Sequence, residues 1–381
     1  MRRGPSSCLA SLAVSAAAAL VVACSYLSPE PEAPLEEKTP VIDSSIEVQP
    51  GETFESIDHA RFGGLSSLAF DVSSGNLLAL SDDRENTRIF RLQVREDPFS
   101  IQPIGVIPLQ GTPVALDPEG LVILPNGHLL VSSEGIQNRD PRTPPGLFEY
   151  SADGQFLDTL ELRERFLPPA TGEITHGVRA NTSFESLTVG VDGSRFFVGL
   201  ETALAQDGEP ATFEHGARTR ILEYKRDGLM YAAGREWLYE LEPLPQPPFK
   251  PSLMINGLVE LVALDESHLL ALERSFIENA DDPAHSMNRI QIYRVSLEGA
   301  TDVSELDSIA GRTGLVPLSK ELVLDLDSAA GLPPALKASN LENFEGMTFG
   351  PAPPDGERRL FMVSDDNFSK DQRTWFLRLT F

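Results

Sequence analysis

The sequence predicts an all-β protein: a β-propeller of about five four-stranded blades, with a sixth blade as the alternative, whose ring is closed by an N-terminal strand. Three observations predict this fold. One β-unit recurs along the chain, acidic residues recur in phase within it, and the chain ends on the third strand of its last copy. Antiparallel four-stranded units that repeat in this way are typical of propeller blades.

Each copy of the unit begins with two apolar runs joined by a tight turn. The runs are apolar without alternation, as in 121–124, which is expected of a strand covered on both faces. Turns such as Asn126-Gly127 and Asp192-Gly193 favour two-residue hairpins. The opening and closing positions of the five hairpins are Gly63 and Asp82, Glu119 and Glu134, Glu185 and Glu201, Glu260 and Glu273, and Glu345 and Asp365.

A third strand follows each hairpin, and a glycine turn then leads to a fourth. The third strands are expected near 89–92, 147–150, 221–224, 292–295 and 376–379. Because the chain ends at Phe381, we expect residues near 44–58 to supply the last blade's fourth strand. A β-sandwich is the alternative, but it gives no reason for acids in phase.

The N-terminus predicts export. Arg2 and Arg3 precede an apolar run at 9–23 that is too short to span a membrane and is typical of a signal peptide. The run ends in Val-Val-Ala-Cys24, which resembles a bacterial lipobox, so we expect Cys24 to be lipidated; an ordinary signal peptide is the alternative. Residues 1–23 are then a lipoprotein signal peptide, 24–43 a lipidated Pro- and Glu-rich tether and 44–381 the propeller.

These features predict a bacterial cell-envelope protein, periplasmic or on the cell surface, held to the membrane through its lipid alone. Cleavage removes Arg2, Arg3 and no acid, which brings the net charge from −26 to −28. Such acidity excludes nucleic acid as a partner, because nucleic-acid binding needs a basic surface. We expect a monomer.

The hairpin topology predicts that the opening and closing acids meet at one mouth of the central channel. The connections expected at that face are long: 135–145, 163–183, 202–218, 243–257, 274–287 and 325–343.

Carboxylates close together repel unless they are protonated, paired with arginine or bound to a cation. Oxygen ligands favour Ca²⁺, with Mg²⁺ or Mn²⁺ as alternatives, and the absence of Cys and His from these positions disfavours zinc. The expected metal ligands are Asp82, Asp83, Glu119, Glu134, Glu201, Glu260, Glu345, Asp365 and Asp366. A girdle of arginine ion pairs without a metal is the alternative.

Several motifs resemble the phytase-like family, described by esterase-like activity of the phytase type. They are Gly-Leu-Ser-Ser-Leu-Ala-Phe with Leu-Ser-Asp82-Asp83-Arg84, Asp117-Pro-Glu119-Gly-Leu, Phe-Glu185-Ser-Leu, Leu-Glu273-Arg274, and Asn-Phe-Glu345-Gly with Val-Ser-Asp365-Asp366-Asn367-Phe. The resemblance covers about 60–381. Gly63 at the first acid position and Ser186 after Glu185 depart from the family pattern.

The resemblance implies hydrolysis of a phosphoester or an ester. We expect a metal-dependent hydrolase of a small, anionic, phosphorylated or esterified molecule, with Glu185 and Glu273 as catalytic residues. Arg84, Arg179, Arg274 and Asn367 are the expected substrate-binding residues. The alternatives are a non-enzymatic envelope propeller that binds a ligand or protein, and a lactone or carboxyl-ester hydrolase. Serine chemistry is disfavoured because no Gly-x-Ser-x-Gly elbow occurs.

Overall fold

The computed structural model describes residues 39–381, apart from residues 229, 339–340 and 352–355. The predicted signal peptide, Cys24 and most of the predicted tether lie outside the described residues. Within the described part of the chain, no helix has the length and apolar character needed to cross a membrane.

Five antiparallel sheets of four strands make up the body. Blade 1 comprises β2 (Leu65–Asp71), β3 (Asn76–Ser81), β4 (Arg88–Glu96) and β5 (Phe99–Pro108). Blade 2 comprises β6 (Pro118–Ile123), β7 (Leu129–Ser133), β8 (Gly146–Tyr150) and β9 (Phe156–Leu160). Blade 3 comprises β10 (Phe184–Val189), β11 (Arg195–Leu200), β12 (Arg218–Asp227) and β13 (Met230–Glu240).

The last two blades comprise β14 (Pro251–Ala263), β15 (His268–Asn279), β16 (Met287–Ser296) and β17 (Ser319–Asp325); and β18 (Asn343–Phe349), β19 (Arg359–Asp365), β20 (Thr374–Thr380) and β1 (Val41–Val48). The described helical elements are short: η1 (Glu55–Ile57), η2 (Glu164–Phe166), η3 (Pro283–His285), η4 (Leu326–Ser328) and α1 (Pro334–Ala338).

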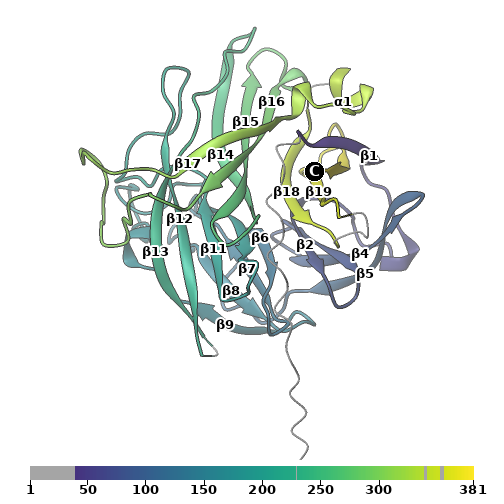
Figure 1. Ribbon diagram of the computed structural model, residues 1–381, viewed down its shortest axis with the longest axis horizontal. Coiled ribbons are helices and arrows are strands. Elements are labelled where there is room, and N and C mark those ends of the chain that lie inside the picture. Colours follow the sequence, from purple (N-terminus) through teal and green to yellow (C-terminus); the bar gives the residue numbers. More distant parts are fainter. Residues whose placement is uncertain (1–38, 229, 339–340, 352–355) are drawn as a thin grey trace, which may run out of the picture. The chain divides into compact units, whose positions relative to one another are not determined.

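The blades close into a ring around their innermost strands. Strand β2 contacts β6, β6 contacts β10, β10 contacts β14, β14 contacts β18, and β18 returns to β2. The predicted five-bladed propeller is therefore confirmed. The closing strand β1 pairs with β20 from Val41 opposite Thr380 to Val48 opposite Thr374, so it begins slightly before the predicted 44–58. Figure 1 shows purple β1 beside the yellow strands of the last blade.

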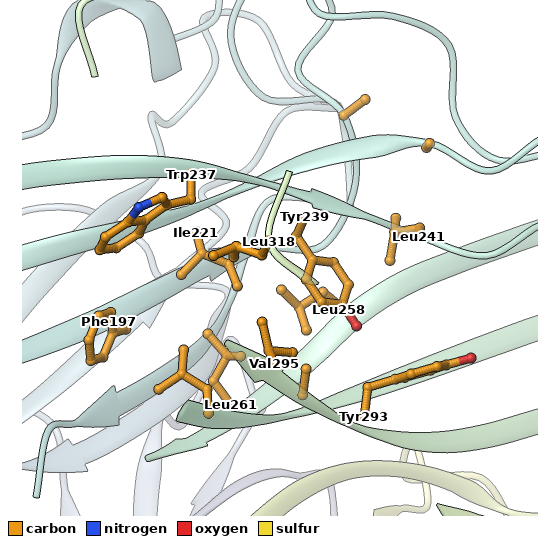
Figure 2. Close-up of a cluster of buried hydrophobic side chains, with 14 of the residues drawn as sticks. Phe197, Ile221, Trp237, Tyr239, Leu241, Leu258, Leu261, Tyr293, Val295 and Leu318 are labelled. Atoms are coloured by element: carbon orange, nitrogen blue, oxygen red, sulfur yellow. The ribbon is translucent and has the colours of Figure 1, made fainter. Parts of the chain in front are cut away.

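Apolar side chains between adjacent blades form the core. Between blades 3 and 4, Phe197 and Trp237 of blade 3 pack with Leu261 and Val295 of blade 4 (Figure 2). Full burial of one such aliphatic or aromatic side chain stabilises the fold by about 1.5–3 kcal/mol. Buried ion pairs, such as that between Arg220 and Glu236, interrupt this apolar packing within blade 3.

Blade 4 differs from the other blades in the length of its inner hairpin. Residues 251–257 and 274–279 continue the strands β14 and β15, where the sequence had indicated loops. Pairing runs without interruption from Gly257 opposite Arg274 to Met254 opposite Ile277. The hairpin therefore extends beyond the level at which the other inner hairpins end.

Candidate functional site

A cavity of about 380 Å³ lies where the innermost strands begin and the second strands end. We call it the acid-lined cavity. Seven carboxylates and two arginines line it, with asparagines and a few apolar residues completing the wall. The charged residues are Asp82, Glu119, Glu134, Glu185, Glu201, Glu345, Asp365, Arg84 and Arg274.

Strand alternation aims the closing acids into this cavity. Successive side chains of a strand point to opposite faces, so residues two apart share a face. In β3, Leu78 and Leu80 pack in the cluster shared with blade 2, and Asp82 continues the same face. In β11, Phe197 packs against blade 4 and Glu201 is in phase with it. A Cβ placed on Gly257 of blade 4 would lie 2.2 Å from Glu201 Cγ, so a glycine is needed there.

In blade 4 the closing acid lies one residue out of phase with the closing acids of the other blades. In β15, Leu269 and Ala271 pack in the cluster shared with blade 3, and Glu273 is in phase with them. Glu273 therefore faces the preceding blade, where it accepts from the Tyr239 hydroxyl at 2.7 Å and pairs with Lys320 at 2.5 Å. The predicted catalytic Glu273 does not line the cavity.

Arg274 takes the position that an acid holds in the other blades. Its Nη2 lies 3.3 Å from Glu345 Oε1 and 3.4 Å from Glu201 Oε1, and its Nη1 donates to the Asn343 side chain. Its Nε is buried and has no hydrogen-bond partner among the described residues. The cavity thus carries a fixed positive charge with one donor still available.

Two groups of three carboxylates are close enough to share one cation. Oxygens of Asp117, Glu119 and Glu134 lie within 4.8 Å of one another, and so do oxygens of Glu134, Glu185 and Glu201. Both groups include Glu134. These buried acidic clusters can bind a metal ion.

The donor set fits a hard cation. None of the described residues lining the cavity is His or Cys, and carboxylate and amide oxygens are the ligands that Ca²⁺ and Mg²⁺ prefer. Beside the first group, Asp82 Oδ1 is buried without a hydrogen-bond partner in the described part of the chain. A buried oxygen of this kind is costly unless a proton or cation satisfies it.

Burial raises the pKa of every carboxyl group that lines the cavity, and neighbouring carboxylates add to the effect for most of them. The pKa of Asp82 is raised to about 7 by burial and by Glu345 and Asp117. The pKa of Glu201 is also raised to about 7, by burial, although Arg274 opposes the shift. Without a cation, these carboxyl groups therefore keep their protons to a higher pH than an isolated carboxyl group does.

Three of the opening acids, Glu119, Glu185 and Glu345, line the cavity, whereas Glu260 does not. Glu119, Glu185 and Glu345 each lie in the β-bulge of their innermost strand. In blade 4 the corresponding bulge, between Leu258 and Glu260, contains Val259 instead of the acid. The Glu260 carboxylate instead accepts from Ser67 Oγ at 2.8 Å and from the Leu187 amide at 3.3 Å. It joins innermost strands of three blades, and burial raises its pKa well above the ordinary value.

Asp366 and Asp83 also lie outside the cavity lining. Asp366 accepts from the Gly64 amide at 2.7 Å, and a Cβ on Gly63 would lie 2.6 Å from its Oδ1. Asp366 thus fills the space beside Gly63. The strand pairing places Ser66 of blade 1 at the bulge position that Glu345 holds in blade 5, so the predicted opening position Gly63 was wrong. Asp83 pairs with Arg88 at 2.6 Å, just outside the cavity.

Some of the predicted substrate-binding residues line the cavity and one does not. Arg84 and Asn367 line the cavity, and Arg84 pairs with Asp117 at 2.5 Å. Arg179 instead donates to the carbonyl oxygens of Ala203 and Gly208, at 3.2 and 2.7 Å, and does not line the cavity.

Sequence reasoning missed several residues of the site. They are Asp117, Asn181, Asn288 and Asn343, and the apolar Leu253, Ile255 and Phe276. Asp117 and Asn343 could have been found, because each lies two residues before an opening acid, Glu119 or Glu345. The others belong to segments whose pairing the repeat does not reveal.

Solved structures of other propellers are similar to this chain. An endo-arabinase from Bacteroides thetaiotaomicron matches with 10% identity and a TM-score of 0.43, over 85% of this chain and 95% of that one. A gluconolactonase from Xanthomonas campestris matches with 12% identity and a TM-score of 0.30, over 82% and 71%. Likeness this distant has no bearing on the reaction.

Sequence comparison is more informative. An uncharacterized secreted protein of Arthroderma benhamiae is 25% identical over 223 residues, which are 52% of this chain and 41% of that protein. The chain therefore spans less than half the length of this relative. The profile of the family described as "Phytase-like: Esterase-like activity of phytase" matches residues 60–368. The chain belongs to the phytase-like family.

Proposed function

We propose that this protein is an exported, metal-dependent hydrolase that opens an ester bond of a small phosphorylated or carboxyl-ester substrate in the acid-lined cavity. The observation that carries the proposal is the convergence of seven carboxylates on one open cavity, with two groups close enough to hold a cation. The family description, which names an esterase-like activity, supports the same reaction class.

Calcium fits the donor set best, with Mg²⁺ and Mn²⁺ as alternatives. The ligands are carboxylates on several separate strands, and Ca²⁺ accepts six to eight oxygens in flexible geometry. Asp117, Glu119 and Glu134 would hold the cation, with Asp82 beside them. When bound, a divalent cation supplies positive charge that stabilises the negative charge developing on the ester.

The remaining residues have defined roles in this reaction. Glu185 accepts a proton from the attacking water, whose oxygen forms a bond to the carbonyl carbon or phosphorus. The bond to the leaving oxygen breaks, and the proton passes from Glu185 to the departing alcohol. Arg274, held in place by Glu201 and Glu345, offers its unpaired Nε to the charge that develops.

Cation binding must precede substrate binding if the substrate is anionic. The ionised carboxylates of the empty cavity, offset by only two lining arginines, would repel a phosphate or carboxylate. A bound divalent cation would offset part of the negative charge of these carboxylates. A bound cation would also displace protons from these carboxyl groups.

The sequence of the N-terminus and the secreted relative support export. Lipidation of Cys24, the bacterial envelope, attachment to the membrane through lipid and a monomeric state are parts of the proposal. Mass spectrometry of the mature N-terminus after expression in a bacterial host tests the lipid, and light scattering of the body at 39–381 tests the monomer.

The test of function uses the purified mature protein. Its metal content is measured first, and phytate, p-nitrophenyl phosphate, carboxyl esters and lactones are then assayed with Ca²⁺ and with chelator. The proposal requires chelator-sensitive turnover that is lost in Glu134→Gln and Glu185→Gln and kept in Glu321→Gln, a matched change on outer strand β17.

Bound metal without turnover of any substrate would favour a non-enzymatic propeller that binds a ligand or protein. A protein that contains no metal and melts identically with chelator and with Ca²⁺ would remove the hydrolase mechanism.

A further inference from the structure

One wall of the acid-lined cavity is a three-stranded extension of blade 4. Strand β15 pairs with β14 through Ile255 opposite Phe276, and with β16 through Phe276 opposite Asn288. The inner hairpins of the other blades have no strand longer than seven residues, whereas β14 has thirteen. Figure 1 shows β14, β15 and β16 running together past the level of the smaller blades. The wall is therefore held by backbone hydrogen bonds on both sides of β15.

One face of this extension lines the cavity. Leu253 and Ile255 of β14, Phe276 of β15 and Asn288 of β16 all contribute to the lining, together with Arg274 at the base. Alternation puts Met254 on the opposite face of β14, and Met254 does not line the cavity. We call Leu253, Ile255 and Phe276 the apolar wall.

The apolar wall is exposed beside the carboxylates that line the cavity. Leu253 has 46% of its surface accessible, and Ile255 and Phe276 are half-buried. All seven carboxylates that line the cavity come from the other four blades or the residues that follow their strands. The cavity is thus divided into an ionic side and a hydrocarbon side.

Asn288 places one further group on the hydrocarbon side. Its Nδ2 donates to the Leu341 carbonyl at 2.8 Å, which fixes the orientation of the amide. Its Oδ1 is buried and has no hydrogen-bond partner in the part of the chain that the structure describes. An acceptor left unpaired beside a cavity is satisfied when a ligand supplies an N–H or O–H group.

We infer that the substrate carries a hydrocarbon or aromatic group that packs on Leu253, Ile255 and Phe276 while its ester bond lies over the carboxylates. Ligand sites typically combine apolar walls with a few polar groups in fixed positions. When a ligand binds, its apolar surface and that of the wall leave water. A polyphosphorylated polyol such as phytate has no such group. The inference rests on the proposed function and narrows its substrate class to esters with an apolar acyl, alkyl or aryl part, which points to carboxyl esters.

The test separates binding from turnover. Calorimetry with acetate, butyrate and hexanoate in the presence of Ca²⁺ measures how affinity depends on hydrocarbon length. Each methylene that leaves water should tighten binding about threefold to fourfold. Leu253→Ser and Phe276→Ser should flatten this dependence. Met254→Ser is the matched control, because it changes a partly exposed side chain on the opposite face of the same strand.

The outcomes distinguish this inference from the proposed function. Equal affinity for the three alkanoates in the wild-type protein, or no binding of any of them, overturns the apolar wall as a binding surface. Hydrolysis of p-nitrophenyl acetate and butyrate with equal kcat/KM would leave the hydrolase standing and overturn the wall. Length-dependent binding with no hydrolysis of any ester would leave the wall standing as a binding surface and overturn the hydrolase. Loss of the dependence in Met254→Ser would also count against the wall.

Discussion

The guanidinium of Arg274 lies 3.3 Å from the carboxylate of Glu345, across the contact between blades 4 and 5. Because β15 is one residue out of phase with the other second strands, an arginine faces the cavity there and an acid does not. Arg274 lies within 3.4 Å of both Glu201 and Glu345, so its charge offsets theirs.

Replacing Arg274 with Gln should destabilise the metal-free protein by about 3 kcal/mol, because two buried carboxylates lose their counter-ion. The same change should increase the stabilisation that Ca²⁺ provides, since a cation then compensates more charge. Thermal unfolding with chelator and with Ca²⁺ measures both effects. Arg294→Gln, which breaks an exposed pair with Glu321, should change neither. Equal melting of the Arg274 variant and wild type in chelator would contradict the prediction.

Glu134→Gln should weaken Ca²⁺ binding at least about tenfold, because Glu134 belongs to both carboxylate groups. Glu273→Gln should leave the affinity within about twofold, since Glu273 is paired with Lys320 and Tyr239 outside the cavity. Calorimetric titration of the chelated protein with Ca²⁺ provides the comparison. If Glu273→Gln proved the more damaging of the two, the assignment of the cavity as the metal centre would be wrong.

The metal-free protein should become less stable as the pH rises. The pKa values of Asp82 and Glu201 are raised to about 7 by burial, above their values near 4 in the unfolded chain. A raised folded-state pKa contributes stability below the unfolded pKa, and this contribution is lost as the pH rises through 7. Urea unfolding in chelator should therefore show a free energy lower at pH 8 than at pH 5 by about 2 kcal/mol or more.

Calcium should flatten this pH dependence, because it replaces the protons on the cavity acids. Glu185→Gln provides a second check, since it removes one of the interacting carboxyl groups without changing the volume of the side chain. A metal-free stability that rises between pH 5 and pH 8 would contradict the raised pKa values.

Gly63→Ala should destabilise the fold by about 2 kcal/mol. Gly63 has φ of +140°, a conformation that favours glycine, and a Cβ there would lie 2.6 Å from Asp366 Oδ1. Gly105→Ala is the control, because its nearest neighbour would be 3.9 Å away and its φ is not positive. Urea unfolding of the two variants tests the prediction, and equal midpoints would show that Asp366 gives way.

The architecture could be predicted from the amino-acid sequence alone. The repeated hairpin, its turns and its third strand predicted five blades. These features are local and periodic, so they survive divergence of the rest of each blade. The recurring acids also indicated where a site would form, and Glu119, Glu134, Glu185 and Glu345 do line one cavity.

Which side chains face that cavity could not be predicted from the repeat, because it depends on the pairing of the strands. In a strand, a shift of one residue turns a side chain to the other face, so Glu273 and Arg274 exchange roles although both lie in the repeat. The position of one bulge sends Glu260 into the channel between strands of other blades. The apolar wall arises because the pairing of β14, β15 and β16 continues where the repeat had indicated loops. Register, bulges and strand length are set by pairing in three dimensions, and the spacing of residues along the chain does not encode them.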